Sequence, residues 1–478
     1  MIPIKKIPTV AGVQLGKELF SLPVGGCRLV STEWLDAKEY CRVKGWIDSV
    51  DPKAEGIEFQ VNLPYNWNRK TIQYGGGGFD GTLVTAEEYP AGQKTTNQPP
   101  PSRGFVTYGS DGGHREKGPW DASWSWNDEM LLNFAHQQLK KTHDAAMAVI
   151  KLFYDGTPQY NYFAGGSNGG REALKVAQIY PQDYDGVLCF FPVLNWVEKA
   201  IKDADNATYI EKAGAEGMID EATYAAFRAK VLEICGKEDG LIHDLSFAAT
   251  KEAEVKEAAS KILTPTQFKV VEHFAKPMRF VEPIANDLKV MPGYIPFAGA
   301  PLATVMPDMS WSHFPSAPGK RDGVMALFGD GVLRYQVLRD REEYDPMTFS
   351  VEEHREQLEA AAKLLDATDP DLKAFHDRGG KMILVHGLAD QLVTPLGTIA
   401  YYESVKKLWD KEELDSFLRF YLIPGYGHGY GEDFMMGTSI VEMLDEWVTL
   451  GQEPESFIAG DDMPGHSDRT MLISRYSG

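Results

Sequence analysis

Five residues, Gly165-Gly166-Ser167-Asn168-Gly169, say more about the fold than any other segment, because they lie between a strand-like aromatic run and a helix-like run. A strained turn from strand to helix lifts a serine hydroxyl clear of a β-sheet, and flanking glycines let the two elements pass close together. A glycine-rich turn without chemistry is the alternative, since so short a pattern arises by chance. The two flanking elements favour a nucleophile elbow that carries Ser167.

Strand-like and helix-like runs alternate on both sides of this turn. Strands are predicted at 57–63, 71–74, 105–108 and 186–191, and helices at 127–153 and 171–180. The alternation returns with strands at 381–386 and 417–423 and helices at 398–407 and 439–450. Such alternation predicts an α/β fold with a doubly wound, mostly parallel sheet.

The stretch between these two parts has a different character. Residues 196–374 contain Ala-, Glu- and Lys-rich helical runs and then a region with Pro, Met and Trp. We expect 196–374 to form a large, mainly helical inserted lid domain. Residues 1–195 and 375–478 would then form one discontinuous catalytic domain. A chain of 478 residues is long enough for this division.

The composition excludes several functions. Hydrophobic residues make up 43% of the chain, but no apolar run approaches the ~20 residues that cross a bilayer, so no membrane partner is expected. With 48 basic and 69 acidic residues, the net charge of -21 disfavours nucleic acid. The first residues show no signal-peptide pattern, and the four cysteines show neither zinc-site nor disulfide spacing. We expect a cytoplasmic protein without metal or cofactor.

A catalytic serine needs a histidine to accept its proton and a carboxylate to fix the tautomer of that histidine. Asp390 follows the predicted strand 381–386, and His428 follows the predicted strand 417–423. Open α/β sheets form their sites after the carboxyl ends of strands, and the order Ser, Asp, His is that of an α/β hydrolase. An ordinary turn aspartate and loop histidine are the alternatives. Order and position favour Asp390 as the acid and His428 as the base.

Three other histidines fit these roles less well. His386 lies inside a strand end, and His114 precedes the serine, so structural hydrogen bonds are expected for both. His143 falls on a helix face and is expected to be solvated.

Attack on an ester creates an oxyanion, which backbone N–H groups must stabilise. In an α/β hydrolase one donor is the residue after the nucleophile, here Asn168. The second comes from the loop after the third strand, which is the glycine run Gly75 to Gly78 here, so Gly76, Gly77 and Gly78 are candidates. A flexible linker is the alternative, but none is expected directly after a strand.

Several segments, in order along most of the chain, resemble the tannase and feruloyl esterase family of α/β hydrolases. They are Tyr40 to Gly45, Leu63 to Asn68, Gly75 to Gly81, Ser110 to His114, Tyr162 to Arg171, Asp185-Gly186, His386 to Asp390 and Pro424 to His428. The resemblance implies the same nucleophile, acid and base. It also implies a lid that recognises the acyl group, commonly a hydroxylated aromatic acid.

The chain departs from the family pattern in two places. Members typically carry a cysteine before the serine and another after the histidine, joined as a disulfide, whereas this chain has Gly166 and Gly429. The elbow and the loop that carries His428 must then be held together by packing. The absence of the disulfide fits a reducing compartment. The usual calcium loop of the lid is shortened to 235–244, where Asp239 and Asp244 offer too few oxygens, so no calcium is expected.

The sequence therefore predicts a serine carboxylesterase that takes small aromatic esters as substrates. In the lid, Trp311, His313, Phe314, Phe328 and Tyr335 supply aromatic surface for an acyl ring, or else form the core of the lid itself. A non-catalytic or acyl-transferring member of the same fold, or an esterase for non-aromatic acyl groups, remains the alternative. The sequence leaves the oligomeric state open.

Overall fold

The computed structural model describes residues 1–118, 120–306, 309–340, 344–429, 433–466 and 468–477, and for 303–306 and 309–311 it describes the backbone alone. A nine-stranded sheet runs through the described chain in the order β15-β14-β9-β8-β6-β7-β4-β3-β2. The strands are β2 (Gly26–Leu35), β3 (Tyr40–Asp48), β4 (Ile57–Pro64), β6 (Lys70–Tyr74), β7 (Val106–Ser110), β8 (Tyr160–Gly166), β9 (Gly186–Phe190), β14 (Lys381–Gly387) and β15 (Leu418–Ile423). From β15 to β7 neighbours are parallel, and β4, β3 and β2 extend the sheet antiparallel.

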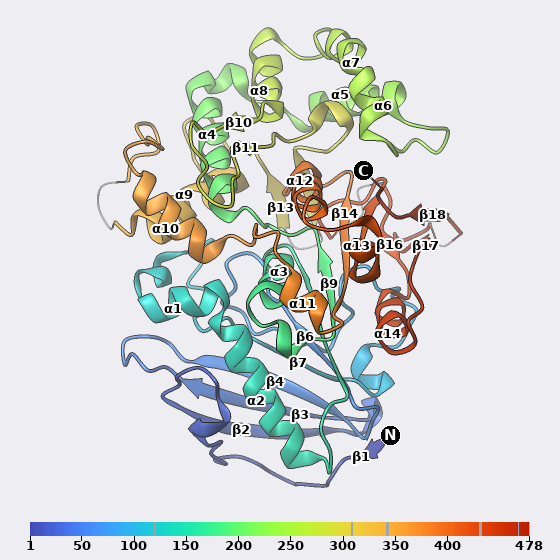
Figure 1. Cartoon of the computed structure of the whole chain (residues 1–478). Helices are drawn as coiled ribbons and strands as arrows, with labels where there is room; N and C mark the ends of the chain where they lie inside the picture. The colour runs from blue at the N-terminus through green and yellow to red at the C-terminus, as the bar shows by residue number, and fades with distance from the viewer. Residues whose placement is uncertain (119, 307–308, 341–343, 430–432, 467, 478) are drawn as a thin grey trace.

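Helices cover both faces of this sheet (Figure 1). The helices of this part of the chain are α1 (Asp128–Leu132), a π-helical turn (Asn133–Gln137), α2 (Gln138–Phe153), α3 (Asn168–Ile179), α11 (Lys373–Asp377), α12 (Pro395–Lys406), α13 (Lys411–Phe417) and α14 (Ile440–Leu450). Val187 and Cys189 of β9 pack on the face that α3 covers, and Leu188 and Phe190 pack on the face that α14 covers. The period-2 alternation of a strand explains this division. The predicted α/β class is confirmed.

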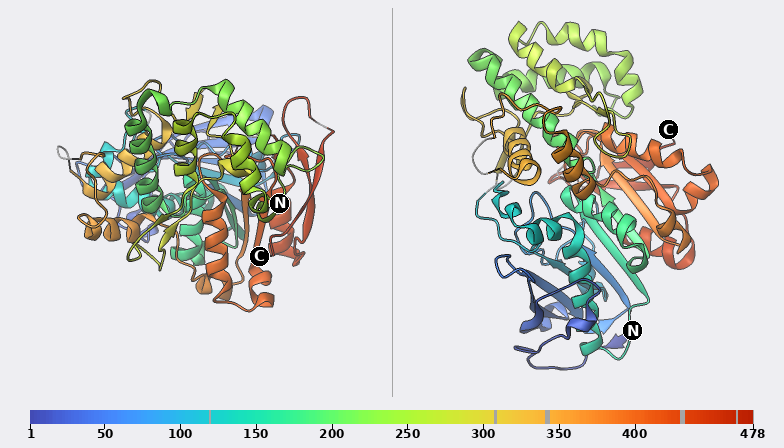
Figure 2. Two further views of the ribbon diagram at one scale, coloured as in Figure 1. Left: turned by 90° about the horizontal axis from the view of Figure 1, so that it is seen from above. Right: turned by 60° about the vertical axis from the view of Figure 1, so that its left-hand side comes forward.

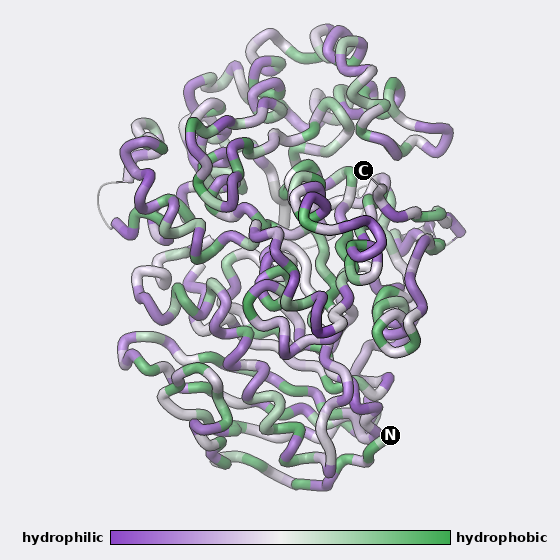
Figure 3. The backbone as a smooth tube through the Cα atoms, viewed as in Figure 1, coloured by the Kyte–Doolittle hydropathy of each residue, from purple (hydrophilic) through white to green (hydrophobic). Residues whose placement is uncertain are grey.

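The described residues of 196–374 form helices and short hairpins beyond the carboxyl ends of the parallel strands (Figures 1 and 2). The helices are α4 (Trp196–Ala213), α5 (Glu221–Cys235), α6 (Leu245–Thr250), α7 (Glu252–Ala259), α8 (Pro265–Ala275), α9 (Val324–Gly331) and α10 (Arg355–Leu365). The hairpins are β10 (Met278–Arg279) with β11 (Val290–Met291), and β12 (Ala303–Met306) with β13 (Met309–Ser312). Hydrophobic residues are frequent along the inner strands, whereas hydrophilic and hydrophobic residues alternate along the helices of 196–374 (Figure 3).

Some elements were not predicted. β2 and β3 form a long antiparallel pair at the sheet edge, and the alternating burial of Tyr40–Asp48 is a strand signal that the sequence carries. Near the C-terminus, β16 (Met436–Gly437), β17 (Ser456–Asp461) and β18 (Thr470–Ser474) form a small separate sheet. At the other end β1 (Ile2–Pro3) pairs with β5 (Asn66–Trp67).

Candidate active site

The turn between β8 and α3 holds Ser167 in a conformation that few side chains adopt. Its backbone has φ 62° and ψ -122°, and its amide donates to the Phe190 carbonyl at 3.1 Å. A Cβ on Gly165 would lie 2.2 Å from the Gly169 carbonyl oxygen, so only glycine fits there. Strain of this kind costs ~1–3 kcal/mol and persists where the surrounding structure holds it. The glycines thus let β8 and α3 approach while the hydroxyl is raised above the sheet.

Ser167, His428 and Asp390 form one continuous chain of hydrogen bonds. Ser167 Oγ lies 2.8 Å from His428 Nε2, and His428 Nδ1 lies 2.8 Å from Asp390 Oδ2. A carboxylate only accepts, so Nδ1 carries the proton and Nε2 is free to accept the serine proton. The three residues follow β8, β15 and β14, whose carboxyl ends meet at one edge of the sheet.

Asp390 is fully buried and strongly bound. Burial alone would raise the pKa of its carboxyl group, but His428 and His386 hold that pKa below its usual range. The amides of Leu392 and Val393 also donate to Oδ1, at 2.9 and 2.8 Å. Asp390 therefore stays ionised and fixes the orientation of the His428 ring.

The other three histidines have structural partners. His386 Nε2 lies 3.0 Å from the Val393 carbonyl oxygen and 3.2 Å from Asp390 Oδ2. His114 Nε2 donates to the Phe79 carbonyl at 2.7 Å. The prediction that His143 is solvated was wrong: it is 5% exposed, and its Nδ1 is hydrogen-bonded to the Tyr108 hydroxyl, because α2 packs that face against the sheet.

The ring of Phe191 lies between the elbow and the base loop. A Cβ on Gly166 would lie 2.6 Å from Phe191 Cε2, and one on Gly429 would lie 3.1 Å from Phe191 Cζ. The same ring packs against His428, with 4.7 Å between ring centroids. An aromatic ring thus bridges the two glycine positions and buttresses the histidine.

The glycine loop after β6 is held by buried carboxyl groups. The Gly76 amide donates to Glu172 Oε2 at 2.8 Å, so this amide is already engaged. Asn168 Nδ2 donates to Asp80 Oδ1 at 2.9 Å, and Gly78 lines the same pocket as Ser167 and Asn168. The loop and the start of α3 are thereby locked together, with Gly77 and Gly78 at the exposed part of the turn.

Glu172 is fully buried, and the half-buried Asp80 is its neighbour. Burial and the neighbouring carboxylate raise the pKa of Asp80 well above its usual range. The direction of this shift favours a protonated Asp80 beside Glu172. Glu172 also accepts a hydrogen bond from Gln138 Nε2 at 2.8 Å. Nothing in the sequence pattern pointed to this pair.

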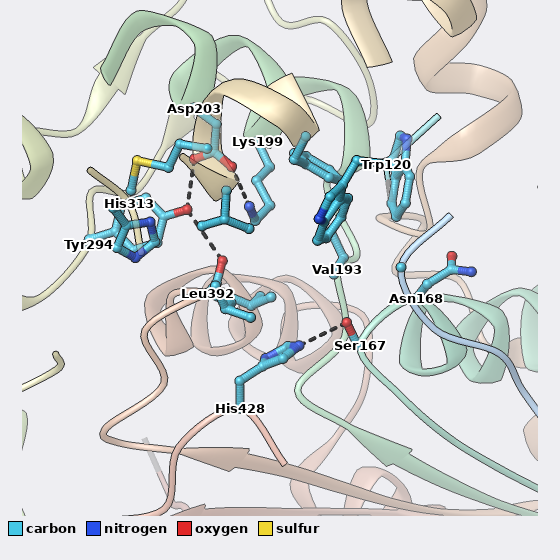
Figure 4. A pocket seen from close by; sticks show the side chains of 16 residues that line it. Trp120, Ser167, Asn168, Val193, Lys199, Asp203, Tyr294, His313, Leu392 and His428 are labelled. Carbon is cyan, nitrogen blue, oxygen red and sulfur yellow. Dashed lines mark hydrogen bonds and ion pairs between the residues drawn. The ribbon is translucent and has the colours of Figure 1, made fainter. Parts of the chain in front are cut away.

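A largely apolar pocket leads away from Ser167 and His428 (Figure 4). Residues from 196–374 and from the parts of the chain on either side of that stretch line it together. They include Trp120, Val193, Trp196, Lys199, Asp203, Tyr294, His313, Val324, Met325, Phe328, Leu392 and Val393. A wall of packed aromatic rings, with Phe328 against Phe79 and Trp196, forms one side. A concave, mostly apolar lining with a few polar groups is typical of a small-molecule binding site.

The predicted lid aromatics have different positions. His313 and Phe328 line the pocket. Phe314 does not line it; its ring packs against Phe274, so it belongs to the lid core. Tyr335 packs against Trp126 outside the pocket lining, and the side chain of Trp311 lies outside the described residues.

The shortened lid loop uses its carboxylates internally. Asp239 accepts from the Leu241 amide and contacts His243 Nε2 at 2.8 Å, and Asp244 caps α6 through Ser246. Within the described ranges no three His, Cys, Asp or Glu side chains gather as metal ligands would. No helix of the described residues combines the length and apolarity needed to cross a bilayer.

Comparison with known proteins gives consistent matches. The family model for tannase and feruloyl esterase matches residues 41–477. An uncharacterized esterase of Agrobacterium fabrum is 30% identical over 95% of this chain and 85% of its own length. A probable feruloyl esterase of Aspergillus flavus is 25% identical over 91% of this chain and 81% of its own. The crystal structure of feruloyl esterase B from Aspergillus oryzae superposes with a TM-score of 0.72 at 21% identity, covering 99% of this chain and 92% of that one.

Proposed function

This chain belongs to the tannase and feruloyl esterase family and is a carboxylic ester hydrolase, and we propose that it cleaves esters of hydroxylated aromatic acids through an acyl-enzyme on Ser167. The proposed roles are nucleophile for Ser167, base for His428 and acid for Asp390. The amides of Asn168, Gly77 and Gly78 are proposed as the oxyanion donors.

The first half of the reaction forms the acyl-enzyme. His428 Nε2 takes the proton of the Ser167 hydroxyl while Oγ attacks the ester carbonyl carbon. The carbonyl oxygen becomes an oxyanion, which accepts hydrogen bonds from the Asn168 amide and the glycine loop. When the C–O bond to the alcohol breaks, the histidine gives its proton to the leaving oxygen, and the acyl group remains on Ser167.

The second half releases the acid. Water occupies the place of the alcohol, gives a proton to His428 Nε2 and attacks the acyl carbon. Collapse of this second intermediate returns the proton to Ser167 Oγ and frees the carboxylic acid. Asp390 stabilises the imidazolium that forms in each half, because its pKa keeps it ionised.

The observation that carries the proposal is the unbroken contact from Asp390 through His428 to Ser167 at the mouth of an apolar pocket. The test is an ester panel with gallate, hydroxycinnamate, hydroxybenzoate and short aliphatic acyl groups, run on wild type and Ser167→Ala. We expect aromatic acyl esters to be hydrolysed and the variant to be inactive with nearly unchanged thermal stability. Turnover of aliphatic acyl esters alone would contradict the aromatic assignment, and turnover by Ser167→Ala would contradict the mechanism.

A further inference from the structure

Four polar side chains meet in the part of the pocket that lies away from Ser167 (Figure 4). Lys199 and Asp203 lie one turn apart on α4 and form an ion pair. The Tyr294 hydroxyl donates to Asp203 Oδ1 at 2.7 Å. The ring of His313 lies beside that of Tyr294, with 5.2 Å between centroids. A buried polar cluster in an otherwise apolar slot indicates that a polar group of the substrate binds there.

Lys199 retains capacity to donate a hydrogen bond. Its side chain is 8% exposed, and an ammonium group has three N–H donors. One donor bonds Asp203, and the nitrogen lies 4.3 Å from the centroid of the Phe328 ring. No further acceptor for Lys199 is found among the described residues, so a ligand oxygen can take the remaining N–H.

His313 offers the complementary acceptor. Its Nε2 lies 2.6 Å from the Gln391 carbonyl oxygen, which only accepts, so Nε2 carries the proton and Nδ1 is a bare acceptor. This Nδ1 is buried and has no hydrogen-bond partner in the described part of the chain. Burial lowers the pKa of His313 to about 3, so the ring stays neutral.

The charges in this cluster cancel. Asp203 balances Lys199, and burial raises the pKa of Tyr294 well above its ordinary value, so the phenol is neutral. A ligand carboxylate would meet Asp203 and find the lysine already paired. An unsubstituted ring would leave the lysine donor and the His313 acceptor unsatisfied. A neutral hydroxyl group both accepts and donates, and it satisfies the cluster.

We propose that Lys199 and His313 bind a phenolic hydroxyl of the acyl group and set the preference for hydroxylated over unsubstituted aromatic acids. The hydroxyl oxygen accepts from Lys199 and its proton is donated to His313 Nδ1. Asp203 and Tyr294 are positioning residues that hold the ammonium group in place. This inference rests on the proposed function, because it takes the pocket beside Ser167 as the acyl pocket.

The experiment measures the ratio of kcat/KM for methyl 4-hydroxybenzoate to that for methyl benzoate, and the same ratio for the two cinnamates. Monomethyl terephthalate tests a carboxylate at the same position. Lys199→Met removes the donor at similar length, and His313→Gln keeps an N–H for the Gln391 carbonyl while removing the ring acceptor. Each ratio is taken within one protein, so a partial loss of folded enzyme does not alter it.

We expect wild type to prefer the hydroxylated esters about tenfold or more and to reject monomethyl terephthalate. Either variant should lower the preference about tenfold and retain hydrolysis of methyl benzoate. Lys202→Met is the matched control, since Lys202 is a buried lysine of α4 that bonds Asn206 and the His273 carbonyl outside this pocket. Lys199→Met/Asp203→Leu removes both charges and replaces the single variant if that one does not fold.

Three results would overturn the inference in distinguishable ways. An unchanged kcat/KM ratio in active Lys199→Met and His313→Gln would contradict the hydroxyl subsite, while the proposed aromatic esterase activity would stand. A preference seen only between 4-hydroxybenzyl acetate and benzyl acetate would show that the pocket takes the alcohol. Hydrolysis of aliphatic acyl esters alone would contradict both the proposed function and this subsite.

Discussion

Replacing Phe191 by alanine should slow ester hydrolysis far more than it weakens substrate binding. The ring is 4% exposed, packs against His428 and fills the space between positions 166 and 429. Without it, the base loop and the elbow lose the group that separates and supports them. His428 would then sample positions in which Nε2 no longer faces Ser167 Oγ.

The expected losses of stability and of kcat follow from the burial of the Phe191 side chain and from its contact with His428. Truncating a buried phenylalanine costs ~3–5 kcal/mol of unfolding free energy. A displacement of ~1 Å in a catalytic group lowers the rate about 100-fold, equivalent to ~2.7 kcal/mol of activation free energy. We therefore expect kcat to fall about 100-fold while KM changes little, since Phe191 is not among the residues that line the pocket.

Steady-state kinetics per folded protein, with thermal melts of each variant, measure both effects. Phe420→Ala is the matched control, because Phe420 is 1% exposed in β15 and packs against Tyr402 and Tyr476 instead of the triad. It should lower the melting temperature similarly and leave kcat per folded protein unchanged. If Phe191→Ala also lowered only the melting temperature, the ring would be ordinary packing and the positioning role would be refuted.

Three further predictions concern the supports of the site. In the Phe191→Ala variant, cysteines introduced at positions 166 and 429 should recover part of kcat when they are oxidised to a disulfide, and should lose it again when a reductant is added. The recovery should be partial because Gly429 has φ 72°. Equal kcat in the oxidised and reduced forms would contradict a bridging role of the Phe191 ring. Asp80→Asn should keep activity within about threefold, because the side-chain amide has the same hydrogen-bonding pattern as a protonated acid. Asp80→Ala should lower the free energy of unfolding by ~1–3 kcal/mol, measured in a thermal melt. An equal loss of stability in both variants would show that Asp80 is ionised. Burial lowers the pKa of His114 to about 4. Between pH 6.5 and 4 the unfolded chain therefore binds a proton that the folded chain does not, so the free energy of unfolding falls as the pH falls, by up to about 3 kcal/mol. His114→Gln should flatten this slope in denaturant titrations, and an unchanged slope would refute the prediction.

The sequence was sufficient for the order of the sheet strands from β4 to β15 and for the turn around Ser167, but not for β2 and β3. The elbow is a local code, in which Gly165 and Gly169 are needed because strand and helix nearly touch. Asp390 and His428 could be placed because each follows a strand whose carboxyl end lies at the same sheet edge. These features depend on local chain geometry and on the order of strands, both of which a single sequence carries.

The pocket depended on long-range packing and was not predictable in the same way. Lys199 and Asp203 have the spacing of an ordinary exposed pair on a helix, and it is the packing of α4 against neighbouring elements, α9 among them, that buries them. Phe314 and Phe328 have the same chemical character, yet one packs in the lid core and the other lines the pocket. Composition could not separate them, because the distinction lies in which side of the lid each backbone position faces.

The most direct test of the central claim is to trap the acyl group on Ser167. The enzyme is mixed with an excess of a slowly hydrolysed 4-hydroxycinnamate aryl ester, quenched in acid within the first turnover and digested for peptide mass spectrometry. An acyl-enzyme mechanism predicts the mass of the acyl group on the peptide that contains Ser167, and no such adduct in Ser167→Ala. An adduct on another residue, or full turnover by Ser167→Ala, would contradict it.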